Sequence, residues 1–444
     1  MAEAEDEEIT TALGRLAAQD TEAADDAGAA LEWIAWGQGL GLVTQERIQM
    51  FCWYELPVKW LTSLDDKVRV AGALVQALDL LGLPRYAMIC RSDTTHEILN
   101  AYETSVEKGK AAFRHAAAAS GIQPPDLPGF EWGAAMGLQE ASAWSCIAGF
   151  LELAVVGGDL VPGARGWKIR QRELVQEQLS IPRADQMGQT HAQLILTERA
   201  GTWVNVRRSA TRRQILAAVV NRLLHPSQLP ADAAADPLPR LNWLLRELDG
   251  GIALTQAGNL SQKFVQQSAA RFGWDFARPP FTEDDLYELY LLRRLAQRLR
   301  LARRSGRTLT LTVTGRRLAA DPERLWRGTA AGLLDGDDFS VFVGELLLAM
   351  LLRTGPVRGE KIKATVGRAV GEEGFLERRT GEPPGRRHIS RAMHDTINLW
   401  RALGLLTPGG DWADRSYGLT AVGEATALEA LRVRATGPRT IPWF

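Results

Sequence analysis

The sequence predicts a mainly α protein: a helical N-terminal domain followed by tandem winged helix-turn-helix domains with short β-hairpin wings. Three observations support this fold class. Apolar residues recur at i, i+3 and i+4 along most of the chain, as on the buried face of an amphipathic helix. Residues 308–314 (TLTLTVT) instead alternate between polar and apolar, the pattern of a half-buried strand. An order of three helices followed by a strand or hairpin candidate occurs twice in the second half.

The composition indicates several domains in a reducing, aqueous compartment. The chain has 444 residues, 45% hydrophobic and 24% charged, which suffices for more than one core. Its cysteines, Cys52, Cys90 and Cys146, are spaced neither as a disulfide framework nor as zinc ligands. The acidic N-terminus lacks an export signal, and apolar runs such as 339–352 are shorter than the roughly 20 residues of a membrane span. We therefore expect a cytoplasmic protein without a membrane partner.

Charge is divided unevenly between the two halves. Residues 1–225 hold 28 acidic and 21 basic side chains, whereas residues 226–444 hold 25 acidic and 31 basic ones. A segment with four prolines, 225–239, lies at the same place and is typical of a linker. We expect an acidic tail at 1–30, a helical domain at 31–225, winged-helix domains at 226–336 and 337–436, and a C-terminal tail at 437–444.

The first half is predicted to be almost entirely helical. Helical periodicity is clear at 68–83, 141–156 and 210–224, with short Gly/Pro breaks between such runs. Residues 1–30 contain nine acids and one arginine, which is typical of a frayed or disordered solvating tail. A specific acidic interaction motif is the alternative.

The second half contains the two winged units. In the first winged unit we expect helices at 240–249, 259–271 and 283–304, followed by the strand at 308–314. In the second winged unit we expect helices at 339–353, 360–371 and 389–406, a Gly-rich hairpin at 407–420, and a closing helix. The phrase Leu-Thr-x-x-Gly occurs at 254–258, 311–315 and 419–423, and its threonine is predicted to N-cap a helix at each place.

The arginines of the first winged unit do not suit it to sequence-specific contacts with DNA bases. Arg293, Arg294 and Arg298 share one helix face, but Glu283, Asp284, Asp285 and Glu288 stand at the N-terminal end, where a recognition helix meets DNA. Thr282 and Asp285 form an approximate capping box there. The arginines expected to hold phosphates beside the strand are Arg303, Arg304, Arg307, Arg316 and Arg317. The alternative is a solvated helix face.

The second winged unit is better suited to duplex DNA. On the helix from Ile389, one polar stripe is formed by Arg391, His394, Asp395, Asn398 and Arg401. Arginine can pair with guanine and asparagine with adenine in the major groove. The expected phosphate partners are Arg386, Arg387 and His388 before this helix, and Lys361 and Lys363 on the helix before it. A solvated face or a protein-docking face is the alternative.

No catalytic constellation can be assembled from the sequence. The six histidines show no HExxH spacing, and neither a Gly-x-x-x-x-Gly-Lys-Ser/Thr loop nor a Gly-x-Ser-x-Gly elbow occurs. We expect neither catalytic residues nor a cofactor nor a metal.

Residues 237–330 carry a recognisable phrase. The features are LTQAGNL at 254–260, a Leu-rich third helix ending near Arg303-Arg304, the Leu-Thr strand, and Asp-Pro-x-x-Leu-Trp at 321–326. They resemble a module of actinobacterial proteins of largely unknown function, including plasmid ORF-like proteins. The resemblance covers about a fifth of the chain and implies a winged-helix fold and a high-GC bacterial source, without catalytic residues.

The sequence therefore predicts a non-enzymatic DNA-binding or DNA-associated protein that contacts duplex DNA mainly through the second winged helix. The alternative is an adaptor subunit of a chromosome-organising or phage-defence complex, in which the acidic half and the winged units dock other proteins. The oligomeric state stays open.

Overall fold

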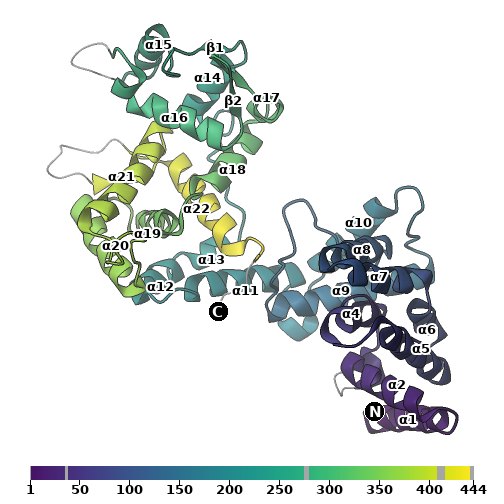
Figure 1. Ribbon diagram of the computed structural model, residues 1–444. Helices are drawn as coiled ribbons and strands as arrows, with labels where there is room; N and C mark the ends of the chain where they lie inside the picture. Colours follow the sequence, from purple (N-terminus) through teal and green to yellow (C-terminus); the bar gives the residue numbers. More distant parts are fainter. Residues whose placement is uncertain (1, 36–38, 275–279, 408–415, 441–444) are drawn as a thin grey trace. The chain divides into compact units, whose positions relative to one another are not determined.

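The computed structural model describes residues 2–35, 39–274, 280–407 and 416–440. The chain is mostly helical and divides into two compact units, residues 1–195 and 196–444 (Figure 1). The prediction of a mainly α protein is confirmed.

The first unit contains short and medium-length helices and no strand among its described residues. Its elements are α1 (Ala2–Ala17), α2 (Thr21–Ala35), η1 (Leu40–Leu42), α3 (Gln45–Met50), the π-helical turn η2 (Phe51–Glu55), α4 (Leu56–Lys59), α5 (Leu64–Leu80), α6 (Pro84–Cys90), α7 (Asp93–Thr104), α8 (Val106–Ala119), α9 (Leu138–Gly157), α10 (Trp167–Ser180) and η3 (Ala184–Gln186). Serine caps begin several of them; at α5, Ser63 and Asp66 form a capping box.

The prediction of an acidic tail at 1–30 is wrong. Helix α2 packs against α5 and buries Ala27, Leu31 and Ile34. Arg69 of α5 pairs with Asp26 at 2.8 Å. The high density of acids conceals an amphipathic pattern of mostly small residues, whose helix can approach its neighbour closely.

Helix α9 is long and apolar enough to cross a membrane by length and composition, and it passes that test alone among the described residues. It also carries a buried carboxylate, Glu152. This carboxylate accepts hydrogen bonds from the Gln45 backbone N–H, from Arg85 Nη1 and from the Tyr86 hydroxyl, each at 2.8 to 2.9 Å. Burial and the bond to Glu152 raise the pKa of Tyr86 to about 12. These contacts tie α9 to α3 and α6.

The second unit contains all five described strands. Helix α11 (His191–Asn205) crosses the boundary, and the elements that follow are α12 (Ala210–Ala217), α13 (Val220–Leu223), α14 (Pro239–Glu247), β1 (Ile252–Ala253), α15 (Gln262–Phe272), η4 (Glu283–Asp285), α16 (Tyr287–Arg298), β2 (Ala302–Ser305), β3 (Thr308–Leu311), α17 (Val313–Ala319), α18 (Pro322–Leu333), α19 (Asp338–Thr354), β4 (Val357–Arg358), α20 (Gly359–Glu373), α21 (Arg386–Ala402), β5 (Ser416–Tyr417) and α22 (Ala421–Thr436).

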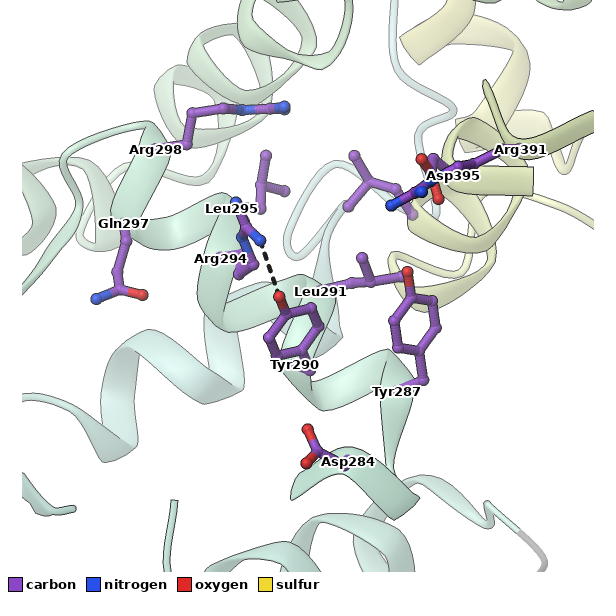
Figure 2. Close-up of a pocket in the computed structure, with 11 residues that line it drawn as sticks. Asp284, Tyr287, Tyr290, Leu291, Arg294, Leu295, Gln297, Arg298, Arg391 and Asp395 are labelled. Carbon is purple, nitrogen blue, oxygen red and sulfur yellow. Dashed lines mark hydrogen bonds between the residues drawn. The ribbon is translucent and has the colours of Figure 1, made fainter. Parts of the chain in front are cut away.

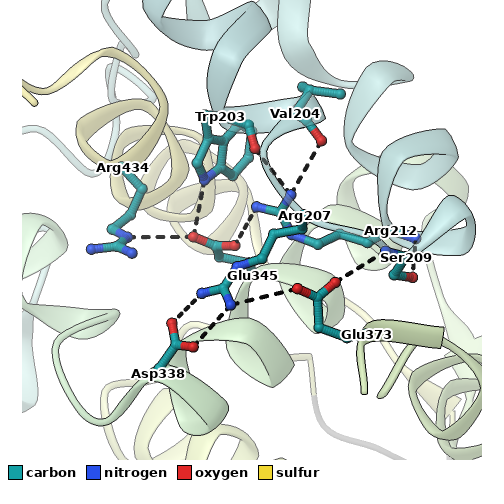
Figure 3. A network of polar contacts seen from close by, with 9 residues as sticks. All are labelled: Trp203, Val204, Arg207, Ser209, Arg212, Asp338, Glu345, Glu373 and Arg434. Atoms are coloured by element: carbon teal, nitrogen blue, oxygen red, sulfur yellow. Dashed lines mark hydrogen bonds and ion pairs between the residues drawn. The ribbon is translucent and has the colours of Figure 1, made fainter. Parts of the chain in front are cut away.

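The boundary between the units falls at 195/196 and not at the expected 225/226. The reason is a polar network inside the second unit (Figure 3). Glu345 of the buried helix α19 accepts from Arg212 Nη2 of α12 at 2.9 Å and from Trp203 Nε1 of α11 at 3.0 Å. Arg434 of α22 approaches the same carboxylate at 3.3 Å. Helices α12 and α13, assigned to the first domain by their position before the linker, therefore pack with the second unit.

A three-stranded antiparallel sheet, in the order β1-β3-β2, follows α14 to α16. Ala302 to Ser305 pair with Leu311 to Thr308, and Ile252 pairs with Leu309. Helix α16 ends at Arg298, shorter than the predicted helix 283–304, because Arg300 adopts a left-handed conformation (φ 55°) that turns the chain into β2. Arg303 and Arg304 therefore lie on a strand.

A second, smaller antiparallel pair joins β4 to β5 after α19, with a further bridge between Leu406 and Leu419. Helix α19 lies in the core and buries all residues from Val341 to Leu352. Residues 408–415 of the predicted hairpin and 441–444 of the predicted tail lie outside the described residues.

Two of the three Leu-Thr-x-x-Gly phrases act as predicted. Thr312 and Thr420 N-cap α17 and α22, each accepting from the backbone N–H of the phrase's glycine. The first phrase does not cap a helix: Thr255 accepts from the Asn259 N–H in a turn, and Ser261 caps α15 instead. The reason is the strand pairing at Leu254, which bridges to Leu260 and closes the turn on itself.

Candidate nucleic-acid interface

Helix α21 carries most of the residues predicted to contact DNA. Its apolar side, which includes Met393, Ile397 and Trp400, is buried, and the helix packs against α19 and α20. Buried positions three or four residues apart define one side of a helix, so the polar residues between them lie on the opposite side. The apolar side of the helix is therefore buried, and the polar residues lie away from it.

The N-terminal half of α21 forms an open cationic hollow. A depression of about 370 Å³ is lined by Arg386, Arg387, Ser390, Arg391 and His394. The three arginines and His394 are exposed. Within the described ranges, no carboxylate lies at ion-pairing distance from any of these arginines. We refer to these five residues as the cationic hollow.

Three glutamates that precede α21 in the sequence, Glu372, Glu373 and Glu377, have other partners. Glu372, at the end of α20, accepts from the Ser209 and Thr211 hydroxyls and from the Thr211 N–H, and these bonds lower the pKa of its carboxyl. Glu373 pairs with Arg207 at 3.6 Å. Glu377 pairs with His388 Nδ1 at 2.6 Å, and the phosphate contact expected of His388 stays a prediction. The positive charge of the hollow is therefore not cancelled by these acids.

The C-terminal half of α21 is less open than predicted. Asn398 and Arg401 are half-buried, and Arg401 Nη1 lies 3.4 Å from Asn398 Oδ1. Arg240 of α14 donates to the backbone carbonyls of Arg401 and Ala402 at 2.7 and 3.3 Å. The predicted stripe is therefore not one continuous open face, because Asn398 and Arg401 at its far end are only partly exposed.

A groove of about 950 Å³ lies along the contact between α16 and α21 (Figure 2). It adjoins the hollow, because Arg391 lines both. On the α16 side, the rings of Tyr287 and Tyr290 are stacked with centroids 5.8 Å apart. Arg294 Nη1 donates to the Tyr290 hydroxyl at 2.8 Å. Asp395 lies beside Arg391 on the α21 side. The sequence analysis missed this groove, although the spacing of the tyrosines, one helical turn apart, was a usable signal.

Lys361 and Lys363 of α20 are exposed but line neither the hollow nor the groove. Lys363 pairs with Glu360 at 2.9 Å. They form a separate surface, and their predicted phosphate contacts stay a prediction.

The arginines around the first sheet are also exposed. Arg303 and Arg307 have no carboxylate at ion-pairing distance in the part of the chain described, while Arg304 donates to the Gly306 carbonyl and Arg316 pairs with Asp249 at 2.9 Å. Arg317, just inside α17, is exposed as well. The β2–β3 hairpin therefore presents two exposed arginines, Arg303 and Arg307, without an ion-pair partner among the described residues.

Helix α16 uses part of its predicted basic face internally. Arg293 pairs with Glu283 at 2.6 Å, and that carboxylate is fully buried and also accepts from the Leu260 N–H. Arg298 donates to the carbonyls of Gly332 and Asp335. Glu283, expected to repel phosphates from a helix start, is thus a structural ion-pair partner. The capping box of Thr282 and Asp285 is confirmed.

The described residues contain no group of three His, Cys, Asp or Glu side chains that could hold a metal ion. Cys52 and Cys90 are buried with their sulfurs 3.6 Å apart, and the hydrogen bond to Cys90 together with burial raises the pKa of the Cys52 thiol. A thiol held protonated is a poor nucleophile.

Comparison with known proteins concerns the first sheet and its helices. Residues 241–324 match the Y4jL N-terminal domain family. The chain is 35% identical over 106 residues to an uncharacterized protein, y4jL, of Sinorhizobium fredii (strain NBRC 101917 / NGR234), and the match covers 20% of this chain and 46% of that protein. No solved structure is significantly similar to the chain.

The matched segment lies within 237–330, where the sequence resembled a module of unknown function. The relative is a Sinorhizobium protein, so it does not support an actinobacterial source. The family match, residues 241–324, ends before α19 and includes no part of α21 or of the cationic hollow.

Proposed function

We propose that this protein is a non-enzymatic DNA-binding protein that holds duplex DNA on the N-terminal half of α21. The observation that carries the proposal is the cationic hollow, in which three exposed arginines and one histidine stand on one surface without described carboxylate partners. The phosphates of a duplex are the polyanion that such a surface suits.

The position of these arginines also favours an anionic partner. Arg386 and Arg387 lie in the first turn of α21, at the positive end of its helix dipole. The interaction of a cation with this end of a helix is unfavourable. A bound phosphate would offset both their mutual repulsion and their repulsion from the dipole.

We further propose that both halves of the second unit are winged helix-turn-helix modules. The order helix, strand, helix, helix, strand supports this in each: α14-β1-α15-α16 precedes the hairpin β2-β3, and α19-β4-α20-α21 precedes β5. In this reading α16 and α21 occupy the recognition-helix position. Helix α16 packs along α21 and lines the groove. The first turn of α21, by contrast, has exposed side chains, so the second module is the one that we expect to contact DNA.

A salt titration of binding to duplex DNA tests this function. We expect full-length protein to bind a blunt duplex with affinity that falls steeply with salt, and the triple variant Arg386→Gln, Arg387→Gln, Arg391→Gln to bind more weakly. If each arginine neutralises one phosphate, the slope of log K against log salt becomes shallower by about 2.7, at roughly 0.9 per phosphate. Fluorescence anisotropy at several salt concentrations measures this.

The matched control changes three exposed arginines of the first unit, Arg114, Arg165 and Arg172, to glutamine. It alters the net charge equally and should leave the slope unchanged. Equal slopes for the wild type and the α21 variant, or no salt-dependent binding by the wild type, would remove the proposal.

An adaptor function is the second candidate, and a different observation favours it. Helix α9 exposes Leu138, Leu153 and Val156, with 87%, 70% and 60% of these side chains accessible. Apolar residues exposed on one helix are typical of a surface that docks another protein. A defined partner that binds wild type but not Leu153→Glu/Val156→Glu, with DNA binding absent in both, would favour the adaptor.

A further inference from the structure

We propose that the groove between α16 and α21 holds an unpaired nucleotide, so that the protein prefers a duplex carrying a single-stranded tail to a blunt duplex. This inference rests on the proposed function, because it takes the duplex to lie on the cationic hollow. It concerns a different set of residues, chiefly Tyr287, Tyr290, Arg294 and Asp395.

The groove and the hollow are neighbours, because Arg391 lines both. A strand whose phosphate contacts Arg391 therefore has its next nucleotide at the mouth of the groove. The groove volume of about 950 Å³ lies in the usual range for sites that hold small organic molecules.

Tyr287 provides a stacking surface for a base. The residue is 41% exposed, and its ring lies beside that of Tyr290, with centroids 5.8 Å apart and an interplanar angle of 20°. Tyr290 is in turn held by Arg294, whose guanidinium lies 5.6 Å from the ring centroid and donates to the hydroxyl. A stacking platform that is already ordered loses little entropy on binding.

The charges in the groove distinguish a base from a phosphate. Asp284 and Asp395 line the groove, whereas no carboxylate lines the hollow. Carboxylates repel phosphates, but they accept hydrogen bonds from the exocyclic amino groups of bases, as from cytosine N4. Arg391 lines both the groove and the hollow. This arrangement suits a nucleotide whose phosphate stays at Arg391 and whose base enters the groove.

The test compares full-length protein on a blunt duplex and on the same duplex with a short single-stranded tail. We expect the tail to raise affinity about 5- to 150-fold, the factor that corresponds to roughly 1–3 kcal/mol for one stacked base. Tyr287→Ala should lose this gain while its affinity for the blunt duplex stays unchanged, and Tyr287→Phe should keep the gain because the ring remains.

A tail of abasic nucleotides provides a test that needs no variant. It keeps the phosphates and removes the bases, and we expect it to give no gain over the blunt duplex. An equal gain from abasic and normal tails would overturn the inference, because phosphates alone would then explain it.

The remaining outcomes separate this inference from the proposed function. Equal affinity for blunt and tailed duplexes overturns the groove assignment and leaves duplex binding intact. No binding of any DNA overturns both. A free mononucleotide that abolishes the tail gain at micromolar concentration would overturn the assignment to DNA, because the groove would then serve a soluble nucleotide.

Discussion

Glu345 places a charge inside the most deeply buried helix of the chain. Its carboxylate is stabilised by Arg212, Trp203 and Arg434, which lie 133, 142 and 89 residues away in the sequence. In the sequence, this glutamate lies within an apolar run. Its presence argues against a membrane span but does not identify its partners. Its partners could not be predicted, because ion pairs between distant residues leave no local pattern.

At this site we expect a strong asymmetry between single and double substitutions. Glu345→Ala should lower the free energy of unfolding by about 3–5 kcal/mol, because Arg212 would remain charged and buried without its partner. Arg212→Met combined with Glu345→Leu should cost clearly less than that. Urea unfolding followed by circular dichroism measures both.

The control for this prediction is Glu360→Ala, which removes an exposed pair with Lys363. Its expected effect is within about 1 kcal/mol. Should Glu345→Ala cost no more than Glu360→Ala, the network would have no role in stability.

At the scale of elements, the two halves of the second unit share one local device. The Thr312 N–H donates to the Leu301 carbonyl and the Thr420 N–H to the Leu405 carbonyl, and each threonine caps the helix that follows. A Cβ added to Gly315 would clash with the Leu301 carbonyl oxygen, and one added to Gly423 would clash with the Leu405 carbonyl oxygen. Glycine is required at both places by this close approach.

Alanine at either glycine should therefore destabilise the second unit. We expect Gly315→Ala and Gly423→Ala each to cost about 1–3 kcal/mol, since the carbonyl belongs to the backbone and must shift. The control is Gly367→Ala in the middle of α20, where the added methyl meets open space and should stabilise by about 0.5–1 kcal/mol. Thermal unfolding of the three variants decides; similar melting temperatures for all three would contradict this account.

Element bounds were predicted well where the signals are local and poorly where tertiary packing overrides them. Helices α19, α20 and α21 lie close to their predicted ranges because their apolar periodicity is strong. Helix α16 ends early because Arg300 turns the chain, and Thr255 lies in a turn because Leu254 pairs with Leu260. Neither the conformation of Arg300 nor the pairing of Leu254 with Leu260 could be predicted from the helix or strand propensities of the neighbouring residues.

At the scale of the whole molecule, the boundary between the units decides which fragment can fold. The second unit begins at Leu196, and its core includes Trp203, Leu216 and Leu223, which precede the proline-rich segment. The linker composition at 225–239 is real, but it lies inside the second unit. Composition alone does not show which core a neighbouring helix joins.

Two fragments test this boundary. We expect residues 196–444 to unfold cooperatively and residues 226–444 to be much less stable, since the shorter fragment lacks Arg212 and leaves Glu345 buried without its closest partner. Limited proteolysis and thermal unfolding compare them. Equal stability of the two fragments would place the boundary at 225/226 after all.

The amino-acid sequence by itself determined the helical class, most helix positions, the strand at 308–311, two threonine caps and the basic character of α21. The tertiary structure alone decided that the N-terminal half of α21 is open, that Asn398 and Arg401 are partly covered, and that a tyrosine-lined groove adjoins Arg391. The physical reason is how far apart in the sequence the interacting residues lie. Periodicity and capping depend on residues within about four positions, whereas exposure, ion pairing and grooves depend on residues that only folding brings together.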